Sequence, residues 1–264
     1  MTSEDRDSTS VVEPDGEGSR SSRSRKKKKK HLPVWQETIL LLGIALVLAI
    51  VIKALFVQAF YIPSESMEPG LVNNDRILVQ KVSYWFGGSP ERGDVVVFKD
   101  PGDWLSPTEK TGPQSGVTEL MAKIGLYPSG GHLVKRVIGV EGDVIKCCDK
   151  QGRITVNGQP LDEDSFVKEK GIDCDGPMIG DCSRNSWTAG PVPKGHIFVM
   201  GDNRGHSADS TVHMCQNNQT DCVPGDEYVP VDLVVGKVFV LLWPSDHFRW
   251  IQRPDTFADV PDAS

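Results

Sequence analysis

The sequence predicts a mainly β domain with loop insertions, preceded by one transmembrane helix. Three observations lead to this prediction. One long uncharged run, Ile39–Ile52, lies near the N-terminus. It is followed by short runs rich in Val and Ile, each bounded by Gly, Pro or Asp, which is typical of strands. The fractions of hydrophobic residues (38%) and charged residues (25%) exclude a wholly disordered chain and a protein with many membrane spans.

Residues 1–33 are predicted to form a disordered cytoplasmic tail, because they hold too few large apolar side chains to offset chain entropy. Residues 1–30 contain nine basic and six acidic side chains, which leaves 20 basic and 30 acidic ones for the rest of the chain. Eight of the nine basic groups lie in residues 20–30, where there is no acid. Such a run indicates an anionic membrane or a nucleic acid as its neighbour. The acidic remainder argues against a protein devoted to nucleic acid.

Residues 34–57 are predicted to be the transmembrane anchor. The fourteen uncharged residues of Ile39–Ile52 are too few by themselves, since a span needs about 20 residues. The apolar run extends over residues 34–57, however, with Glu37 and Lys53 near its ends. Lys53 can extend its ammonium group to the membrane interface. Leu233–Trp243, the next most apolar stretch, is shorter and rich in β-branched residues, so it predicts a buried strand.

The basic run also predicts the orientation of the anchor. An excess of Lys and Arg before the span keeps the N-terminus in the cytoplasm and places residues 58–264 outside, as in a single-pass protein of the plasma membrane. The alternative is a cleaved secretory signal with its cut site at residues 57–59. Lys53 and Phe56 suit such a cleavage region poorly.

All six cysteines follow the predicted span, which indicates disulfides in an oxidising compartment. Two local pairings are possible, Cys174–Cys182 and Cys215–Cys222. The remaining Cys147 and Cys148 would form a strained vicinal bridge or stay free thiols. A zinc site is the competing interpretation, but the sequence has no Cys-x-x-Cys pair. We therefore expect no metal, and the lack of a glycine-rich phosphate loop predicts no nucleotide cofactor.

The predicted domain occupies residues 58–246. The runs that predict its strands are Arg76–Val82, Asp94–Lys99, His132–Val140, Val144–Cys148, Arg153–Val156, His196–Met200 and Val231–Leu242. Two Gly-rich stretches, 100–131 and 161–190, are predicted insertions, and residues 247–264 are predicted to form a C-terminal tail. The strands are too short and too irregularly spaced for a regular sandwich.

Three segments combine residue types that carry chemistry. The first, Phe60–Gly70, holds two serines, a methionine and two prolines soon after the span, which predicts a stiff turn. In the second, Gly131–Gly139, the adjacent Lys135 and Arg136 face opposite sides of an apolar strand, so one of them is expected to point toward the core. The third, Met200–Ser210, is a dense polar loop directly after an apolar strand. Taken singly, these patterns also fit a linker, a paired core lysine and a capped turn.

In this order and behind a span, the three segments resemble those of bacterial type I signal peptidases, the leader peptidase family of serine proteases with a Ser–Lys dyad. The matching signatures are Ser-x-Ser-Met-x-Pro from Ser64, Lys-Arg-Val from Lys135, Gly-Asp-Asn-Arg-x-x-Ser-x-Asp-Ser from Gly201, and the block Arg92–Val96. The resemblance covers about residues 58–157 and 193–243. It implies a β-rich catalytic domain on the membrane. It also implies removal of signal peptides from secreted preproteins by cleavage after small side chains at positions −3 and −1.

The resemblance also implies a role for each matched residue. Ser66 matches the nucleophile, and Lys135 matches the general base. Ser64 matches the hydroxyl that completes the oxyanion hole with the Ser66 backbone N–H. Ser207 matches the serine that orients the lysine, and Asp209 matches a structural carboxylate near the dyad.

The chemistry agrees with these roles. A serine hydroxyl is a weak nucleophile that needs an adjacent base, and a lysine acts as a base only when it is neutral. Lowering the pKa of a lysine from about 10.4 to about 7–8 takes about 4 kcal/mol. We expect burial of Lys135 among Leu133, Val134, Val137 and Ile138 to supply this free energy.

Shallow apolar pockets near the serine would explain the preference for small side chains. The matched positions suggest Phe60, Ile62, Leu71 and Val134 as pocket residues. The substrate is expected to pair as a strand with backbone edges beside the dyad. The expected partners are therefore secreted preproteins and membrane lipid, with no nucleic acid, and the protein is expected to be a monomer.

The chain departs from the family pattern in the third segment. Gly205 and His206 replace an Asp-Asn pair, and Thr211 replaces an Arg beside the carboxylate. We therefore hypothesise that Arg136 pairs with Asp209.

Three alternatives stay open. A Ser-His-Asp triad could use His132 or His206, although neither histidine lies where the family pattern has a catalytic group. Another type of Ser–Lys hydrolase is disfavoured by the span and by the specific blocks. A non-enzymatic, membrane-anchored binding module with disulfide-bearing loops would leave a core-pointing Lys135 unexplained.

Overall fold

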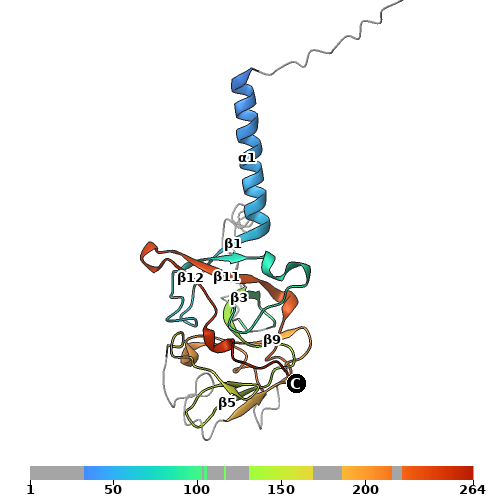
Figure 1. The fold of residues 1–264 in the computed structure, drawn as a ribbon, viewed down its shortest axis with the longest axis vertical. Helices are drawn as coiled ribbons and strands as arrows, with labels where there is room; N and C mark the ends of the chain where they lie inside the picture. The colour runs from blue at the N-terminus through green and yellow to red at the C-terminus, as the bar shows by residue number, and fades with distance from the viewer. Residues whose placement is uncertain are drawn as a thin grey trace, which may run out of the picture. The chain divides into compact units, whose positions relative to one another are not determined.

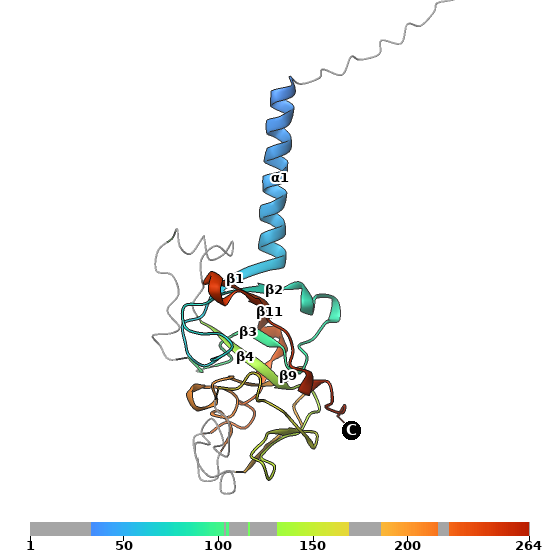
Figure 2. The same cartoon turned by 60° about the vertical axis from the view of Figure 1, so that its left-hand side comes forward.

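The computed structural model describes residues 33–102, 104–105, 116, 131–168, 186–215 and 222–263. The predicted tail up to residue 32, the Cys174–Cys182 pairing and most of both predicted insertions lie outside the described residues. In the described part, one long helix precedes a series of strands (Figure 1), which the turned view in Figure 2 also shows. The predicted mainly β fold class is confirmed.

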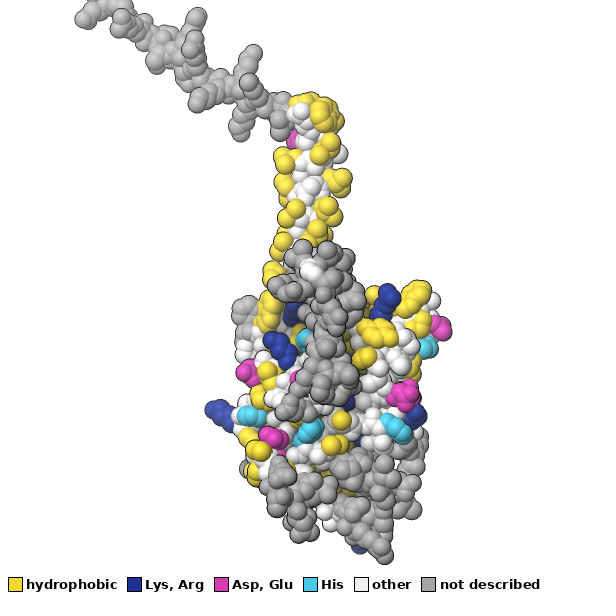
Figure 3. All heavy atoms as spheres, turned by 180° about the vertical axis from the view of Figure 1, so that it is seen from behind, with side chains coloured by type: hydrophobic (Ala, Val, Ile, Leu, Met, Phe, Trp, Pro, Cys, Tyr) yellow, Lys and Arg dark blue, Asp and Glu magenta, His cyan; other side chains and the backbone are white. Residues whose placement is uncertain are grey.

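The N-terminal helix α1 comprises Val34–Phe56 and ends one residue before the predicted end of the span. Its stretch from Val34 to Val51 is long and apolar enough to cross a membrane. Hydrophobic side chains cover the face of the helix seen in Figure 3, and Leu40, Leu46 and Leu48 are each more than half exposed. A helix that packs on a sheet usually has one apolar stripe, so apolar side chains around its circumference favour a membrane span.

The strands alternate with turns and short 3-10 helices. Their bounds are β1 Val57–Tyr61, β2 Arg76–Gln80, β3 Val95–Lys99, β4 His132–Gly139, β5 Ile145–Cys147, β6 Thr155–Val156, β7 Gln159–Pro160, β8 Trp187–Ala189, β9 His196–Met200, β10 Val229–Pro230, β11 Val234–Trp243 and β12 Arg249–Trp250. The 3-10 helices are η1 Val82–Gly87, η2 Arg204–His206, η3 Val231–Leu233, η4 Ser245–His247 and η5 Asp255–Phe257. Each predicted strand run contains a strand. The runs did not predict β1, which continues the apolar sequence of the helix, or β7, β8, β10 and β12, which have only two or three residues each.

The strands form two antiparallel sheets. In the larger sheet the strand order is β1-β2-β11-β3-β4-β9-β10, and β12 also pairs with β11. The smaller sheet has the order β7-β6-β5-β8. Figure 2 shows β1, β2, β11, β3, β4 and β9 following one another through the larger sheet. The β3–β4 register places Lys135 opposite Val96 and Arg136 opposite Val95.

The larger sheet is covered on both faces. On β3, Val95 belongs to one hydrophobic cluster and its neighbour Val96 belongs to another. Alternate side chains of a strand point to opposite faces, so the continuous apolar run of β3 reflects burial on both sides. The expectation that one of Lys135 and Arg136 points into the core is met by Lys135, and Arg136 is buried as well because both faces of the sheet are covered.

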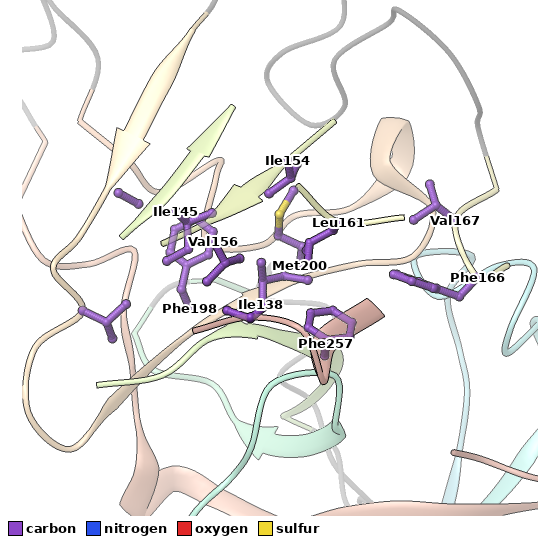
Figure 4. Packing of buried hydrophobic residues seen from close by; sticks show 13 residues of the cluster. Ile138, Ile145, Ile154, Val156, Leu161, Phe166, Val167, Phe198, Met200 and Phe257 are labelled. Atoms are coloured by element: carbon purple, nitrogen blue, oxygen red, sulfur yellow. The ribbon is translucent and has the colours of Figure 1, made fainter. Parts of the chain in front are cut away.

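A third hydrophobic cluster joins the two sheets (Figure 4). Ile138 and Met200 of the larger sheet pack with Ile145 and Val156 of the smaller sheet. Phe257, from the segment expected to be a C-terminal tail, lies in the same cluster. The strand β12 of that segment pairs with β11, so residues 247–264 contribute to both a sheet and the core.

Both ends of the second predicted insertion also belong to the core. Leu161, Phe166 and Val167 lie in the cluster that joins the sheets, and β8 pairs with β5. In the first predicted insertion, Trp104 is buried edge-on against Phe98. These stretches were predicted to be insertions because they are Gly-rich overall, but a few of their apolar side chains are buried in the core and hold them in place.

Two of the cysteine pairings considered above lie within the described residues. Cys215 and Cys222 form a disulfide. Cys147 and Cys148 form the vicinal bridge, so the free-thiol alternative for these two cysteines is wrong.

Candidate active site

A buried serine and a buried lysine meet beside β4. Lys135 Nζ donates a hydrogen bond to Ser66 Oγ at 2.7 Å. Ser66 lies in the turn between β1 and β2, and 69 residues of sequence separate it from Lys135. Only 6% of Ser66 and 4% of Lys135 is exposed. An amine at this distance from a hydroxyl is within reach of its proton, which is the geometric requirement for a general base.

Two donors accompany the Ser66 hydroxyl. Ser64 Oγ lies 3.3 Å from Ser66 Oγ. The Ser66 backbone N–H has no acceptor within the described residues. Hydroxyl and backbone N–H groups of this kind can stabilise an oxyanion that develops beside the nucleophile. Because Ser64 is exposed, a ligand can reach its hydroxyl from solvent.

Asp209 is fully buried and accepts hydrogen bonds on both oxygens. Ser207 Oγ donates to Oδ2 at 2.6 Å, and the Gly201 N–H donates to the same oxygen at 2.9 Å. Thr211 donates to Oδ1 through its backbone N–H at 3.0 Å and its hydroxyl at 2.8 Å. Asp209 therefore fixes the Ser207 hydroxyl and both ends of the polar loop after β9.

The hypothesised pairing of Arg136 with Asp209 is wrong. Arg136 holds both carboxylate oxygens of Asp202, with Nε–Oδ1 at 2.8 Å and Nη2–Oδ2 at 2.6 Å. Its Nη1 donates to Gly93 O at 2.9 Å, and its guanidinium lies 4.5 Å from the ring centroid of Phe166. The donors to Asp209 come from its own loop, so Asp202 is the carboxylate that compensates the buried guanidinium.

Asn203 and Gly201 were not assigned to the site from the sequence. Asn203 forms hydrogen bonds with the Ser66 turn, and Gly201 packs closely against it. The Asn203 N–H donates to Ser66 O and its Nδ2 donates to Glu65 O, each at 3.0 Å. A Cβ on Gly201 would lie 2.4 Å from Ser66 O and 2.3 Å from Ser207 Oγ, so a larger residue does not fit. Both residues belong to the polar loop singled out in the sequence, and the density of polar residues there was the available signal.

The four suggested pocket residues lie together. Phe60, Ile62 and Leu71 belong to one hydrophobic cluster, and Val134 packs against it. The first three are only 5%, 2% and 2% exposed, so they form part of the core and present little surface of their own. Leu71 also lines a cavity of about 360 Å³.

The histidines considered for a triad are not at the serine hydroxyl, where Lys135 lies. His206 is exposed on η2. His132 contacts Phe60, with 5.3 Å between the ring centroids. Within the residues that the structure describes, no group of three or more His, Cys, Asp or Glu side chains could hold a metal ion.

A third histidine, His213, lies three residues after the polar loop Met200–Ser210. Its ring stacks on Trp104 with 4.3 Å between the centroids. Its Nε2 is buried and has no hydrogen-bond partner in the described part of the chain. Burial lowers the pKa of His213, and the carboxylates of Asp209 and Asp226 oppose this effect.

Comparison with known proteins points to one family. The family model described as "Signal peptidase, peptidase S26" matches residues 35–243. The chain is 39% identical over 225 residues to Signal peptidase I of Mycobacterium tuberculosis, covering 81% of this chain and 74% of that protein. It is 32% identical over 223 residues to Signal peptidase I of Leptolyngbya laminosa, covering 84% and 86%. It is 31% identical over 201 residues to Signal peptidase I U of Bacillus subtilis, covering 73% and 87%.

Proposed function

The chain belongs to the signal peptidase family, peptidase S26, and from this premise we propose that it removes signal peptides from secreted preproteins with Ser66 as nucleophile and Lys135 as general base. The observation that carries the proposal is the 2.7 Å hydrogen bond between Lys135 Nζ and Ser66 Oγ. The two residues come from separate segments of the chain, and both are buried. A surface lysine that meets a serine by chance would not be buried in this way.

The proposed reaction has two stages. In the first, Lys135 Nζ takes the proton of Ser66 Oγ as the oxygen attacks the scissile carbonyl carbon. The tetrahedral intermediate collapses, the peptide C–N bond breaks, and Lys135 returns the proton to the leaving amine. In the second, Lys135 takes a proton from water as the water oxygen attacks the acyl ester. The ester C–O bond then breaks, Lys135 returns the proton to Ser66 Oγ, and the signal peptide leaves with a C-terminal carboxyl group. The Ser66 N–H and the Ser64 hydroxyl stabilise the oxyanion in both stages.

The surroundings of Lys135 support its role as a base. Removing an ammonium group from water disfavours its charged form, so burial favours the neutral amine that the reaction needs. Ser207 has the role of orienting this amine. The hydrogen bond from its hydroxyl to Asp209 fixes the direction in which the Ser207 oxygen presents its lone pairs.

Specificity for small side chains follows from the tightly packed residues near the serine. Phe60, Ile62, Leu71 and Val134 leave little room at the surface, so side chains at positions −1 and −3 of the substrate have to be small. The substrate binds as an extended strand whose backbone pairs beside Ser64 and Lys135.

The helix α1 is proposed to anchor the enzyme in the plasma membrane as a single span. The basic residues 20–30 keep the N-terminus in the cytoplasm, and the catalytic domain faces the secreted preproteins outside. No cofactor is needed for this chemistry, and the enzyme acts as a monomer.

Cleavage of a preprotein by the full chain in liposomes tests the proposal, with the cut site mapped by mass spectrometry. Wild type should cut once, after small residues at −3 and −1. Ser66→Ala should give no product, and Ser64→Ala should lose about 100–1000-fold in kcat without complete inactivation. Ser89→Ala changes an exposed serine outside the site and serves as the matched control. Wild-type rates from Ser66→Ala would refute the proposed nucleophile, whereas no cleavage by wild type would favour a binding module.

A further inference from the structure

The peptide unit between Glu65 and Ser66 is held by the side chain of Asn203. Asn203 is fully buried, and its Nδ2 donates to Glu65 O at 3.0 Å. Its backbone N–H donates to the next carbonyl, Ser66 O, at the same distance of 3.0 Å. The Glu68 N–H also donates to Glu65 O, at 3.1 Å, from within the turn itself. Asn203 is therefore the contact that ties this peptide to a different segment of the chain.

The direction of the Glu65 carbonyl determines the direction of the Ser66 N–H. The Glu65–Ser66 bond is not among the cis peptides of the described residues, so it is trans. In a trans peptide the C=O and the N–H lie in one plane and point in opposite directions. Because the carbonyl points to Asn203 Nδ2, the Ser66 N–H points away from Asn203. It has no acceptor there within the described residues, so it can donate to a ligand.

The other end of the Asn203 amide gives a second reason to assign it a role beyond packing. Its Oδ1 is buried and accepts no hydrogen bond from the described residues. A buried acceptor without a donor destabilises a fold. A leucine of similar size would remove this defect, so the benefit of an asparagine here lies in its Nδ2 donor.

We propose that Asn203 is a positioning residue for the oxyanion hole. Its amide holds the Glu65–Ser66 peptide so that the Ser66 N–H points at the substrate oxygen that becomes negative when Ser66 attacks. This role rests on the proposed function of Ser66 as the nucleophile. Asn203 itself touches neither the substrate nor the reacting atoms. Because the Glu68 N–H also holds Glu65 O, loss of the amide loosens the peptide without releasing it.

Asn203→Leu tests this role, since it removes the amide and keeps the backbone N–H that holds Ser66 O. We expect kcat to fall about tenfold, less than the loss of about 100–1000-fold that follows complete removal of an oxyanion donor. KM should stay within about twofold, because the interaction acts in the transition state. The unfolding temperature should be unchanged or higher. Asn203→Asp, which points a carboxylate at Glu65 O, should lower kcat further.

The matched control is Asn157→Gly. Asn157 also donates its Nδ2 to a backbone carbonyl, Pro261 O at 2.9 Å, and its φ of 51° suits glycine. This control should lower the unfolding temperature and leave kcat unchanged. Ser66→Ala in the same assay separates the two possible failures. Cleavage by Ser66→Ala would overturn the proposed function. Full kcat in Asn203→Leu beside an inactive Ser66→Ala would overturn only the role of Asn203. The same conclusion would follow if kcat fell in step with the unfolding temperature in Asn203→Leu and in Asn157→Gly.

Discussion

The buried ion pair of Arg136 and Asp202 leads to a large and specific stability prediction. Asp202→Leu removes both oxygens that the guanidinium holds, at 2.8 and 2.6 Å. The two side chains are 5% and 1% exposed, so Arg136 would be left charged and buried, with Gly93 O and the Phe166 ring as its remaining partners among the described residues. Breaking a buried pair from one side destabilises by about 3–5 kcal/mol. For a domain of this size, that lowers the unfolding temperature by about 6–20 °C.

A double-mutant cycle on the full chain in detergent measures this effect. Arg136→Met together with Asp202→Leu replaces the pair by apolar side chains and should recover most of the loss. The coupling energy of Arg136 with Asp202 should exceed about 1.5 kcal/mol, whereas its coupling with Asp209 should stay within about 0.5 kcal/mol. Equal coupling to both carboxylates, or none to Asp202, would refute the assignment.

Three further predictions concern the polar loop and its surroundings. Gly201→Ala should lower kcat by at least about 100-fold, because its Cβ would lie 2.4 Å from Ser66 O and displace the serine turn; near-normal cleavage by the folded variant would contradict this. Replacing both Cys215 and Cys222 by Ala opens a loop with a sequence separation of 7 and should lower the free energy of unfolding in urea by about 2.5 kcal/mol; an unchanged value would count against the disulfide. Because burial lowers the pKa of His213, the unfolded chain, whose histidine titrates at about pH 6.5, gains its proton at a higher pH than the folded chain, so stability decreases as the pH falls through this range. His213→Phe should remove this decrease from urea unfolding curves between about pH 7 and pH 5, and an unchanged slope would show that another group is responsible.

Most of the fold could be predicted from local patterns, and the exceptions have physical reasons. The apolar runs of β3 and β4 predicted strands because both faces of the larger sheet are covered. Residues 247–264 looked like a tail because their composition is polar. Their place in the fold depends on a few apolar side chains, such as Phe257, and on backbone pairing between β12 and β11. Neither contact leaves a periodic signal in the sequence.

The candidate site was predictable where residue identity carries the chemistry. Ser66 and Lys135 stand out by their motifs, although nothing in a separation of 69 residues predicts their contact. The partner of Arg136 was not predictable, because Asp202 and Asp209 lie in the same loop and only its folded path decides which carboxylate faces the guanidinium. Asn203 was missed because it binds backbone carbonyls, which every residue has.

The central claim is that Lys135 is the base for Ser66. The most direct test is kcat for preprotein cleavage by Lys135→Met in liposomes, since methionine keeps an unbranched apolar side chain and lacks the amine. We predict that kcat falls to the background rate of Ser66→Ala while the unfolding temperature stays equal to or above that of wild type, because no ammonium group then has to be buried. A folded Lys135→Met variant with kcat within about tenfold of wild type would contradict the Ser–Lys mechanism.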